Sequence, residues 1–302
     1  MKRRDLADLL LLAAIWGSSF LFMRLLAPVF GPVALAFVRV AGAALVLLPL
    51  LLWRGEGPAM AARWRALAVL SLTNSALPFL LFNFALLTLP AGLSSVFNAA
   101  TPLATALIAW LWLGDPLTRW RSAGLVIGLT GVAGLAALRS LAGGGGAAAF
   151  RFDSTAALAI AACLAAALMY GHAGNHTRRY LRGVPPMALA TGTQIGAALF
   201  LALPAALTWP ETAPGPGDWA MAMALATLCS GLAYVLYFRL IAHVGPTQAA
   251  SVTFLVPVFA SAWGAMLLGE TVGLAMLAGG ALIVVGTTLV LGMWPRRRAV
   301  PT

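Results

Sequence analysis

Charged residues are scarce in this chain. Of its 302 residues, 9% are charged and 62% are hydrophobic, and the mean hydropathy is +0.94. A soluble domain carries roughly 25–35% charged residues on its surface, so a soluble globular protein is excluded. At ~20 apolar residues per membrane crossing, the chain accommodates about ten crossings joined by short connections. We therefore expect an all-α polytopic membrane protein.

Acidic residues are the rarest charged type, with eight Asp and Glu against nineteen Lys and Arg. All eight fall between apolar runs or at their ends. Exporters of cations and proton-coupled carriers usually depend on a carboxylate inside the membrane. Its absence argues against a cationic solute. It also favours facilitated movement over tight proton coupling, unless a histidine carries the proton.

Cysteine is nearly absent, and recognisable catalytic motifs are missing. Cys163 and Cys229 each lie inside an apolar run, which is typical of small buried hydrophobes rather than of a disulfide framework or a metal site. The chain has no zinc-protease motif, nucleophile elbow or phosphate-binding loop. We therefore expect no enzymatic activity, no metal and no cofactor.

Long apolar runs, by contrast, fill the chain, and Gly- and Pro-rich turns separate them. The runs predict ten transmembrane helices at residues 6–26, 32–53, 66–88, 92–113, 119–139, 156–180, 186–208, 218–242, 247–268 and 272–293.

Basic residues are distributed unevenly between alternate connections. One side has fifteen of the nineteen: Lys2, Arg3, Arg4, Arg54, Arg63, Arg65, Arg119, Arg121, Arg178, Arg179, Arg182, Arg239 and Arg296 to Arg298. The other side has Arg24, Arg139 and Arg151. The bias predicts that both termini are cytoplasmic. Since no nucleic-acid-reading module accompanies the charge, the expected partners are the lipid bilayer and a small-molecule solute, not nucleic acid.

An internal repeat emerges when the sequence is slid against itself by 154 or 155 residues. The aligned pairs include Trp16-Gly17 with Tyr170-Gly171, Pro32 with Pro186, Pro102 with Pro257, Leu113-Gly114-Asp115 with Leu268-Gly269-Glu270, Gly124 with Gly279, and Gly131 with Gly286. The pattern predicts one repeat at 1–142, a Gly-rich linker at 143–153 and a second repeat at 154–302. Because each repeat holds five helices, the second is inverted.

Inverted repeats are typical of secondary transporters, whose solute site lies where the halves meet. A chain that contains both halves is expected to act as a monomer.

Polar side chains recur at helical spacing within several apolar runs. Each one alone favours interhelical hydrogen bonding, whereas the set favours a cavity that a solute passes through. The cavity candidates are Trp16, Ser19, Asn74, Ser75, Asn98, Thr101, Tyr170, Ser230, Tyr234, Tyr237 and Trp263. Such a neutral, aromatic lining suits a neutral or zwitterionic solute, for example threonine, methionine or an aromatic amino acid.

Arg39 is the only charge well inside an apolar run. It either ties its helix to neighbouring helices or attracts an anionic group such as a carboxylate. His172 and His176 lack an accompanying carboxylate or cysteine, so they are candidate gate residues rather than metal ligands. Pro78, Pro102 and Pro257 are candidate hinges, with a static kink as the alternative.

Several of these motifs together resemble a known family. Trp-Gly-Ser-Ser from Trp16, Arg39, the Pro-Ala-Gly-Leu-Ser-Ser stretch from Pro90 and the Leu-Gly-Asp/Glu helix endings are similar to the EamA family of the drug/metabolite transporter superfamily. Within it, the YddG-type amino-acid exporters are the nearest match. Asp115 departs mildly, since the family usually has Glu there.

The resemblance implies a multi-pass transporter of the bacterial inner membrane. We expect export of amino acids or similar metabolites by alternating access. Transport of a nucleoside, sugar or neutral drug, and a non-transporting scaffold, remain alternatives.

Overall fold

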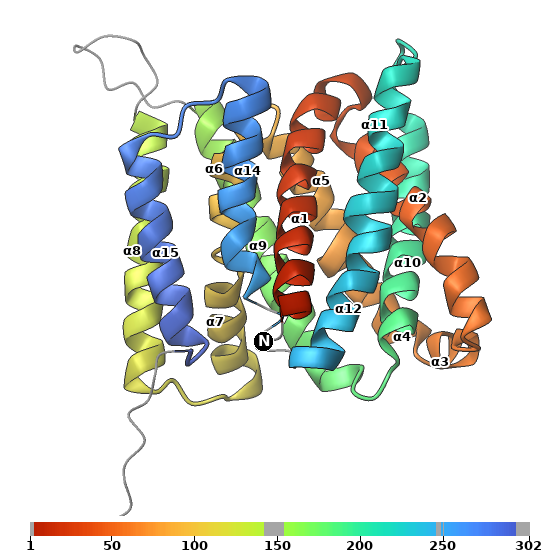
Figure 1. Ribbon diagram of the computed structural model, residues 1–302, viewed down its shortest axis with the longest axis horizontal. Helices are drawn as coiled ribbons and strands as arrows, with labels where there is room; N and C mark the ends of the chain where they lie inside the picture. The colour runs from red at the N-terminus through yellow and green to blue at the C-terminus, as the bar shows by residue number, and fades with distance from the viewer. Residues whose placement is uncertain (1–2, 142–153, 246–248, 250, 294–302) are drawn as a thin grey trace, which may run out of the picture.

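The computed structural model describes residues 3–141, 154–245, 249 and 251–293 (Figure 1). The described part consists of helices and their connections, without a strand. The predicted linker at 143–153 and both chain ends lie outside it, as does residue 247, where the ninth predicted helix begins.

The described residues of the first half form nine helical segments. They are α1 (Arg3–Phe30), α2 (Pro32–Trp53), α3 (Gly57–Ala62), α4 (Trp64–Ser71), η1 (Leu72–Ala76), α5 (Leu77–Ala85), α6 (Ala91–Asn98), α7 (Thr101–Leu113) and α8 (Arg119–Leu141). The described residues of the second half form α9 (Ser154–Tyr180), α10 (Pro186–Leu207), α11 (Pro216–Ala226), η2 (Thr227–Leu232), α12 (Ala233–Val244), α14 (Val252–Leu268) and α15 (Leu274–Val290).

The helices confirm a multi-pass membrane protein. In the described part, eight helices or continuous helical runs are long and apolar enough to cross a bilayer, and α14 and α15 are two shorter apolar helices. These ten units correspond in order to the ten predicted apolar runs. The third unit is α4, η1 and α5 joined end to end. The fourth is α6 and α7, separated by Ala99 and Ala100 just before Pro102.

Local sequence explains where several helices begin and end. Pro32, Pro186 and Pro216 occupy first-turn positions, where the missing N–H has no helical partner to lose. Gly114 and Gly269 terminate α7 and α14 in the left-handed conformation, with φ of 70° and 65°. A residue with a Cβ is strained there, which explains why the Leu-Gly-Asp and Leu-Gly-Glu endings contain glycine.

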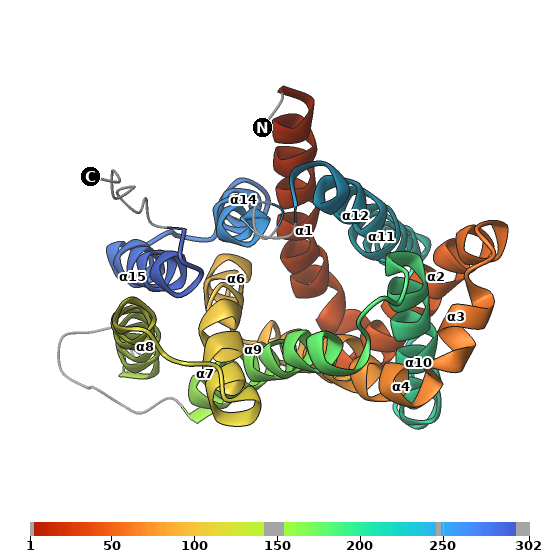
Figure 2. The ribbon, with the colours of Figure 1, turned by 90° about the horizontal axis from the view of Figure 1, so that it is seen from below.

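The helices stand side by side between two ends of the molecule (Figure 1). The end that carries Arg3 also carries the α7–α8 and α9–α10 connections and is called here the basic end. Viewed from that end, α8 and α15 pair at one edge of the molecule, while α2, α3, α4 and α10 gather at another (Figure 2).

Glycine allows very close packing of α8 against α15. A Cβ on Gly124 would lie 2.6 Å from the carbonyl oxygen of Gly286, and a Cβ on Gly131 would lie 2.9 Å from that of Gly279. The pairing of an early residue on one helix with a late residue on the other means that the two helices run antiparallel. The glycines that the sequence repeat aligns in these two helices therefore meet each other within one chain.

Four further glycine contacts join the halves. Gly17 of α1 faces Phe259 and Ala260 of α14, and Gly171 of α9 faces Ala104 and Thr105 of α7. Likewise, Gly42 of α2 lies against Ala226, and Gly196 of α10 lies against Ser71. These contacts join eight helices: α1, α2, α4, α7, α9, α10, α11 and α14.

Candidate functional site

The centre of the candidate site is the guanidinium of Arg39, which is only 5% exposed. Its Nε donates to Ser230 Oγ at 3.0 Å, and its Nη1 lies 3.2 Å from Met23 Sδ. Its Cζ stands 3.8 Å above the centre of the Phe79 ring. The arginine therefore joins α2 to α1, α5 and η2.

Two hydroxyls and a thiol from the second half lie near the same guanidinium. Tyr170 of α9, Tyr234 of α12 and Cys229 of η2 lie close enough to interact with Arg39 electrostatically. The candidates Arg39, Tyr170, Ser230 and Tyr234 are thus brought together.

A layer of amides and hydroxyls adjoins this centre. Tyr234 has hydrogen-bonding contacts with Asn74 and Gln194, and Gln194 Nε2 donates to Ser75 Oγ at 3.3 Å. Ser75 and Gln194 are fully buried. Gln194 was missed in the sequence, although a polar residue inside the apolar run at 186–208 meets the criterion that found the others.

The residues of this layer come from irregular helix. Asn74 and Ser75 belong to the π-helical turn η1, and Cys229 and Ser230 belong to the π-helical turn η2. A π turn widens the helix locally and turns side chains out of the regular register, and it is frequent at functional sites. Leu72 at the start of η1 and Thr227 at the start of η2 are 155 positions apart, which matches the offset of the sequence repeat.

Aromatic residues extend the site along α1 and α9. The rings of Trp16 and Tyr237 are 5.2 Å apart, and Tyr170 stacks with Phe82 at 6.3 Å. Trp16, Tyr170 and Tyr237 are half-buried. Ser19, one turn after Trp16 on α1, is buried with an exposed fraction of 4%.

Three candidates lie in different surroundings. Asn98 ends α6, and Thr101 begins α7 with a buried Oγ1 that lacks a hydrogen-bond partner. Trp263 of α14 donates from Nε1 to the carbonyl oxygen of Ala14 at 3.2 Å, so its polar edge contacts α1. The periodicity that grouped these residues identifies a helix face but not the helix it meets.

The two candidate gate histidines lie in an aromatic column toward the basic end. His172 stacks on Trp112 at 5.1 Å, and His176 packs against Tyr180 at 4.9 Å. His176 Nε2 is also 3.0 Å from the carbonyl oxygen of Ala66. The column joins α9 to α7 and α4. Within the described residues, no three His, Cys, Asp or Glu side chains group as metal ligands.

Beside this column, a cavity of about 500 Å³ opens at the basic end, lined by Trp112, Leu113, Arg178, Arg179 and Arg182. Arg178 donates two hydrogen bonds to Asp115, both at 2.7 Å. These bonds hold the pKa of Asp115 below its ordinary value. The ion pair is therefore intact at neutral pH. Its contribution to stability is lost only as the pH falls below the pKa of an ordinary aspartate.

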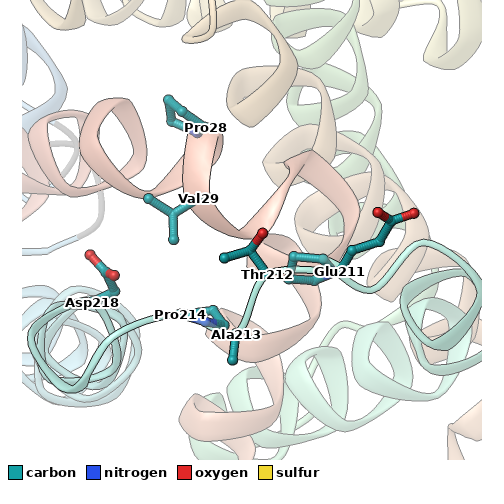
Figure 3. A pocket seen from close by; sticks show the side chains of 8 residues that line it. Pro28, Val29, Glu211, Thr212, Ala213, Pro214 and Asp218 are labelled. Carbon is teal, nitrogen blue, oxygen red and sulfur yellow. The ribbon is translucent and has the colours of Figure 1, made fainter.

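A cavity of similar size, about 510 Å³, opens at the opposite end (Figure 3). It is formed by the end of α1 with Pro28 and Val29, by the α10–α11 connection and by Asp218. In Figure 3, Thr212 points toward the α1 side of this cavity, while Glu211 points away from it. The polar centre around Arg39 therefore lies in a molecule that is hollowed at both ends.

At that same end, Glu270 links the α14–α15 connection to α6. Its two carboxylate oxygens accept the backbone N–H groups of Ala91 and Gly92 at 2.9 and 3.3 Å. A negative carboxylate satisfies these free N–H groups and complements the positive end of the helix dipole.

Energetically, the centre holds a cation without neutralising it. Placing a charged side chain near the middle of a membrane helix costs ~2.5–3.5 kcal/mol on insertion scales. A desolvated cation–π contact contributes about 2 kcal/mol and a hydrogen bond to a charged group about 1.5–3 kcal/mol. The contacts of Arg39 with Phe79 and Ser230 thus offset the insertion cost. The groups gathered here offer binding contacts of three kinds: hydrogen bonds, aromatic faces and one positive charge.

Comparison with known proteins gives a consistent assignment. A model of the EamA-like transporter family matches twice, at residues 7–137 and 157–292. The uncharacterized transporter YvbV of Bacillus subtilis is 25% identical over 296 residues, which are 96% of this chain and 92% of the relative. A probable terminal-alkyne amino-acid exporter of Streptantibioticus cattleyicolor is 27% identical over 289 residues, covering 93% of this chain and 91% of its own.

The fold is also represented among solved structures. One crystal structure superposes with a TM-score of 0.64 at 19% identity and covers 96% of both chains. This similarity establishes the shared fold.

Proposed function

This chain belongs to the EamA-like transporter family, and on that premise we propose that it is a secondary transporter that exports small neutral or zwitterionic metabolites, with amino acids as the first candidates. The observation that carries the proposal is the buried cluster of Arg39, Tyr170, Ser230 and Tyr234, in which side chains from both matched regions converge inside an apolar helical bundle. Buried polar groups in a membrane are expensive, and they mark solute pathways.

We further propose that the chain is built as two inverted five-helix repeats. Three pairs of contacts support this, because the two contacts of each pair are related by the offset of 154 or 155 residues. Gly17 packs on α14 as Gly171 packs on α7, and Gly42 packs on Ala226 as Gly196 packs on Ser71. In the third pair, Gly124 packs on Gly286 as Gly131 packs on Gly279. The two π-helical turns and the double family match follow the same offset. The positive-inside rule then assigns the basic end and both termini to the cytoplasm.

Alternating access follows from this organisation. In inverted-repeat transporters one half rocks against the other around a fixed central site. The interruptions next to Pro78 and Pro102, and Pro257 inside α14, are the proposed pivots, since proline removes a helical hydrogen bond. The cavities at the two ends are the proposed entrances, with His172 and His176 as a gate near the cytoplasmic one.

Amino acids are favoured as solutes by two independent observations. One relative at 27% identity is named a probable amino-acid exporter. The site itself offers aromatic rings for an apolar side chain together with amides and hydroxyls for polar groups. The proposed location is a bacterial inner (plasma) membrane, in keeping with the bacterial source of the relatives from Bacillus and Streptantibioticus.

The direct test is transport by the purified protein in liposomes. Labelled threonine, methionine and phenylalanine are supplied, and at least one is expected to move several-fold faster than in protein-free liposomes. If none does, the amino-acid proposal is wrong, and nucleosides and sugars are the next panel. A chain that moves no solute of either panel would instead be a non-transporting membrane protein.

A prediction for the aromatic lining follows. Trp16→Ala and Tyr234→Ala are each expected to slow transport about tenfold, because each removes a half-buried aromatic surface from the site while the helices still pack. Initial rates in liposomes measure this effect. Trp53→Ala is the matched control, since Trp53 is 83% exposed at the end of α2. Wild-type rates for both site variants would contradict the position of the cavity.

A further inference from the structure

Arg39 presents more hydrogen-bond donors than the protein accepts. A guanidinium has five N–H donors in a rigid fork, and the two contacts to Ser230 and Met23 occupy Nε and one position on Nη1. The described ion pairs join Arg178 to Asp115, Arg239 to Asp8 and His243 to Asp5, so no carboxylate of the described residues pairs with Arg39. The site therefore contains an uncompensated cation with part of its fork unused.

We infer that Arg39 binds the carboxylate of the transported solute, which makes carboxylate-bearing metabolites, and α-amino acids first among them, the solute class. This inference rests on the transport function proposed above. A carboxylate matches the guanidinium fork through two parallel N–H···O bonds. The Met23 thioether is a weak acceptor that a carboxylate oxygen displaces at little cost, whereas the Phe79 face and Ser230 keep the fork oriented.

The orientation of Arg39 is set by all the elements around it. The Phe79 ring packs against the guanidinium, with the Arg39 Cζ 3.8 Å from the ring centre, and limits its movement on that side. Tyr170 and Tyr234 add hydroxyl dipoles from α9 and α12 on the second half of the chain. A carboxylate bound to Arg39 therefore contacts both halves at once, and its negative charge neutralises the buried cation only while the solute is bound.

A second unsatisfied group lies near enough to complete an amino-acid site. Gln194 is fully buried, and its Oε1 has no hydrogen-bond partner while its Nε2 donates to Ser75. Tyr234 contacts Gln194 on one side and interacts with Arg39 on the other. Because Oε1 is an acceptor, it suits the ammonium group of the same solute, and the aromatic rings nearby accept that cation over their faces.

A purely structural arginine makes a different prediction. If Arg39 only tied α2 to α1, α5 and η2, its replacement would lower thermal stability without changing which solutes compete. The discriminating quantity is therefore the ratio between the half-inhibitory concentrations of a solute and of its carboxyl-blocked analogue.

The experiment is competition against labelled methionine in liposomes containing the purified full-length protein. The competitors are methionine, methionine amide, which lacks the carboxylate, and 4-(methylthio)butanoate, which lacks the amine. For the wild type, the amide is expected to compete at least tenfold more weakly than methionine, and 4-(methylthio)butanoate to retain competition. In Arg39→Gln the half-inhibitory concentration of methionine is expected to rise at least tenfold, and the preference over the amide to fall toward one.

The controls separate charge, fork and folding. Arg39→Lys keeps the charge but lacks the fork, so an intermediate preference is expected. Arg24→Gln removes a different arginine, one that donates a hydrogen bond to the carbonyl oxygen of Leu86 just after α5. This variant should leave the preference for methionine over its amide unchanged. If Arg39→Gln does not fold, the inference is tested by the ratio of methionine to amide competition in the wild type and in Arg39→Lys.

Each failure has its own signature. If labelled methionine, threonine and phenylalanine all fail to move in the wild type, the proposed amino-acid transport is wrong and this inference falls with it. If methionine moves but its amide competes equally well, transport stands and the role of Arg39 is overturned. An unchanged ratio in both Arg39 variants overturns it as well.

Discussion

Gly286→Ala is expected to lower the melting temperature of the purified protein by roughly 6–12 °C, which corresponds to a loss of about 3 kcal/mol at 2–4 °C per kcal/mol. A Cβ at this position would lie 2.5 Å from the carbonyl oxygen of Gly124 and 2.5 Å from the amide nitrogen of Gly128. Both are backbone atoms, so no side chain can rotate away and α8 and α15 must separate. In a membrane, helices associate through close packing and not through the hydrophobic effect, so separation removes the main stabilising contact.

Gly280→Ala is the matched control on the same helix. A Cβ there would meet only the Val96 side chain, at 3.7 Å, which is ordinary contact. Gly134→Ala on α8 is a second control, since nothing lies within 4 Å of its added Cβ. Because alanine also favours helix, both controls should match or exceed the wild-type melting temperature. Equal melting temperatures for Gly286→Ala and Gly280→Ala would contradict the close approach of α8 and α15.

The same glycines show which parts of the fold could be predicted from the sequence. Apolar runs and turn residues predicted the helices, and the internal repeat singled out the glycines of α8 and α15. The antiparallel pairing of Gly124 with Gly286 was not predictable, since spacing along one helix says nothing about the register of its partner. The π-helical turns at Leu72 and Thr227 were also missed, because a single extra residue in a turn leaves no distinct local pattern.

For the candidate site, polarity inside an apolar run was the useful signal. It identified Arg39, Ser230 and Tyr234, which the structure brings together. It placed Trp263 with them on the basis of residue type, whereas the structure turns its Nε1 toward the Ala14 carbonyl. Partners such as Phe79 could not be distinguished from ordinary core residues, because their contribution depends on an arginine from another helix.

The Leu-Gly-Glu ending of α14 was predictable from the sequence in one respect and not in another. Its repetition was visible in the sequence, and its Gly269 has the left-handed φ that such an ending needs. What Glu270 binds was not visible, since Ala91 and Gly92 are 179 and 178 residues away. The contact closes the end of the molecule opposite the basic end, between α6 of the first half and the α14–α15 connection of the second.

Glu270→Ala is therefore expected to destabilise the protein by about 2–4 kcal/mol. The substitution leaves the N–H groups of Ala91 and Gly92 without their acceptors, and a buried unsatisfied group costs about 1–3 kcal/mol. Every residue of α6 from Ala91 to Phe97 is buried, so water reaches this end of the helix poorly. Thermal unfolding in detergent, followed by tryptophan fluorescence, measures the loss as a fall of roughly 5–10 °C.

Three further variants decide whether the carboxylate acts through this contact. Glu211→Ala removes an exposed carboxylate at the same end and should be neutral. Glu270→Gln keeps one acceptor oxygen but turns an amide N–H toward a backbone N–H, so an intermediate loss is expected. A Cβ at Gly264 would collide with the Glu270 carboxylate, so Gly264→Ala should displace it and destabilise by a similar amount. Because Glu270→Ala and Gly264→Ala disrupt the same contact, the variant with both substitutions should lose far less stability than the sum of the two single losses. Full additivity would mean that Glu270 stabilises the protein by some other route.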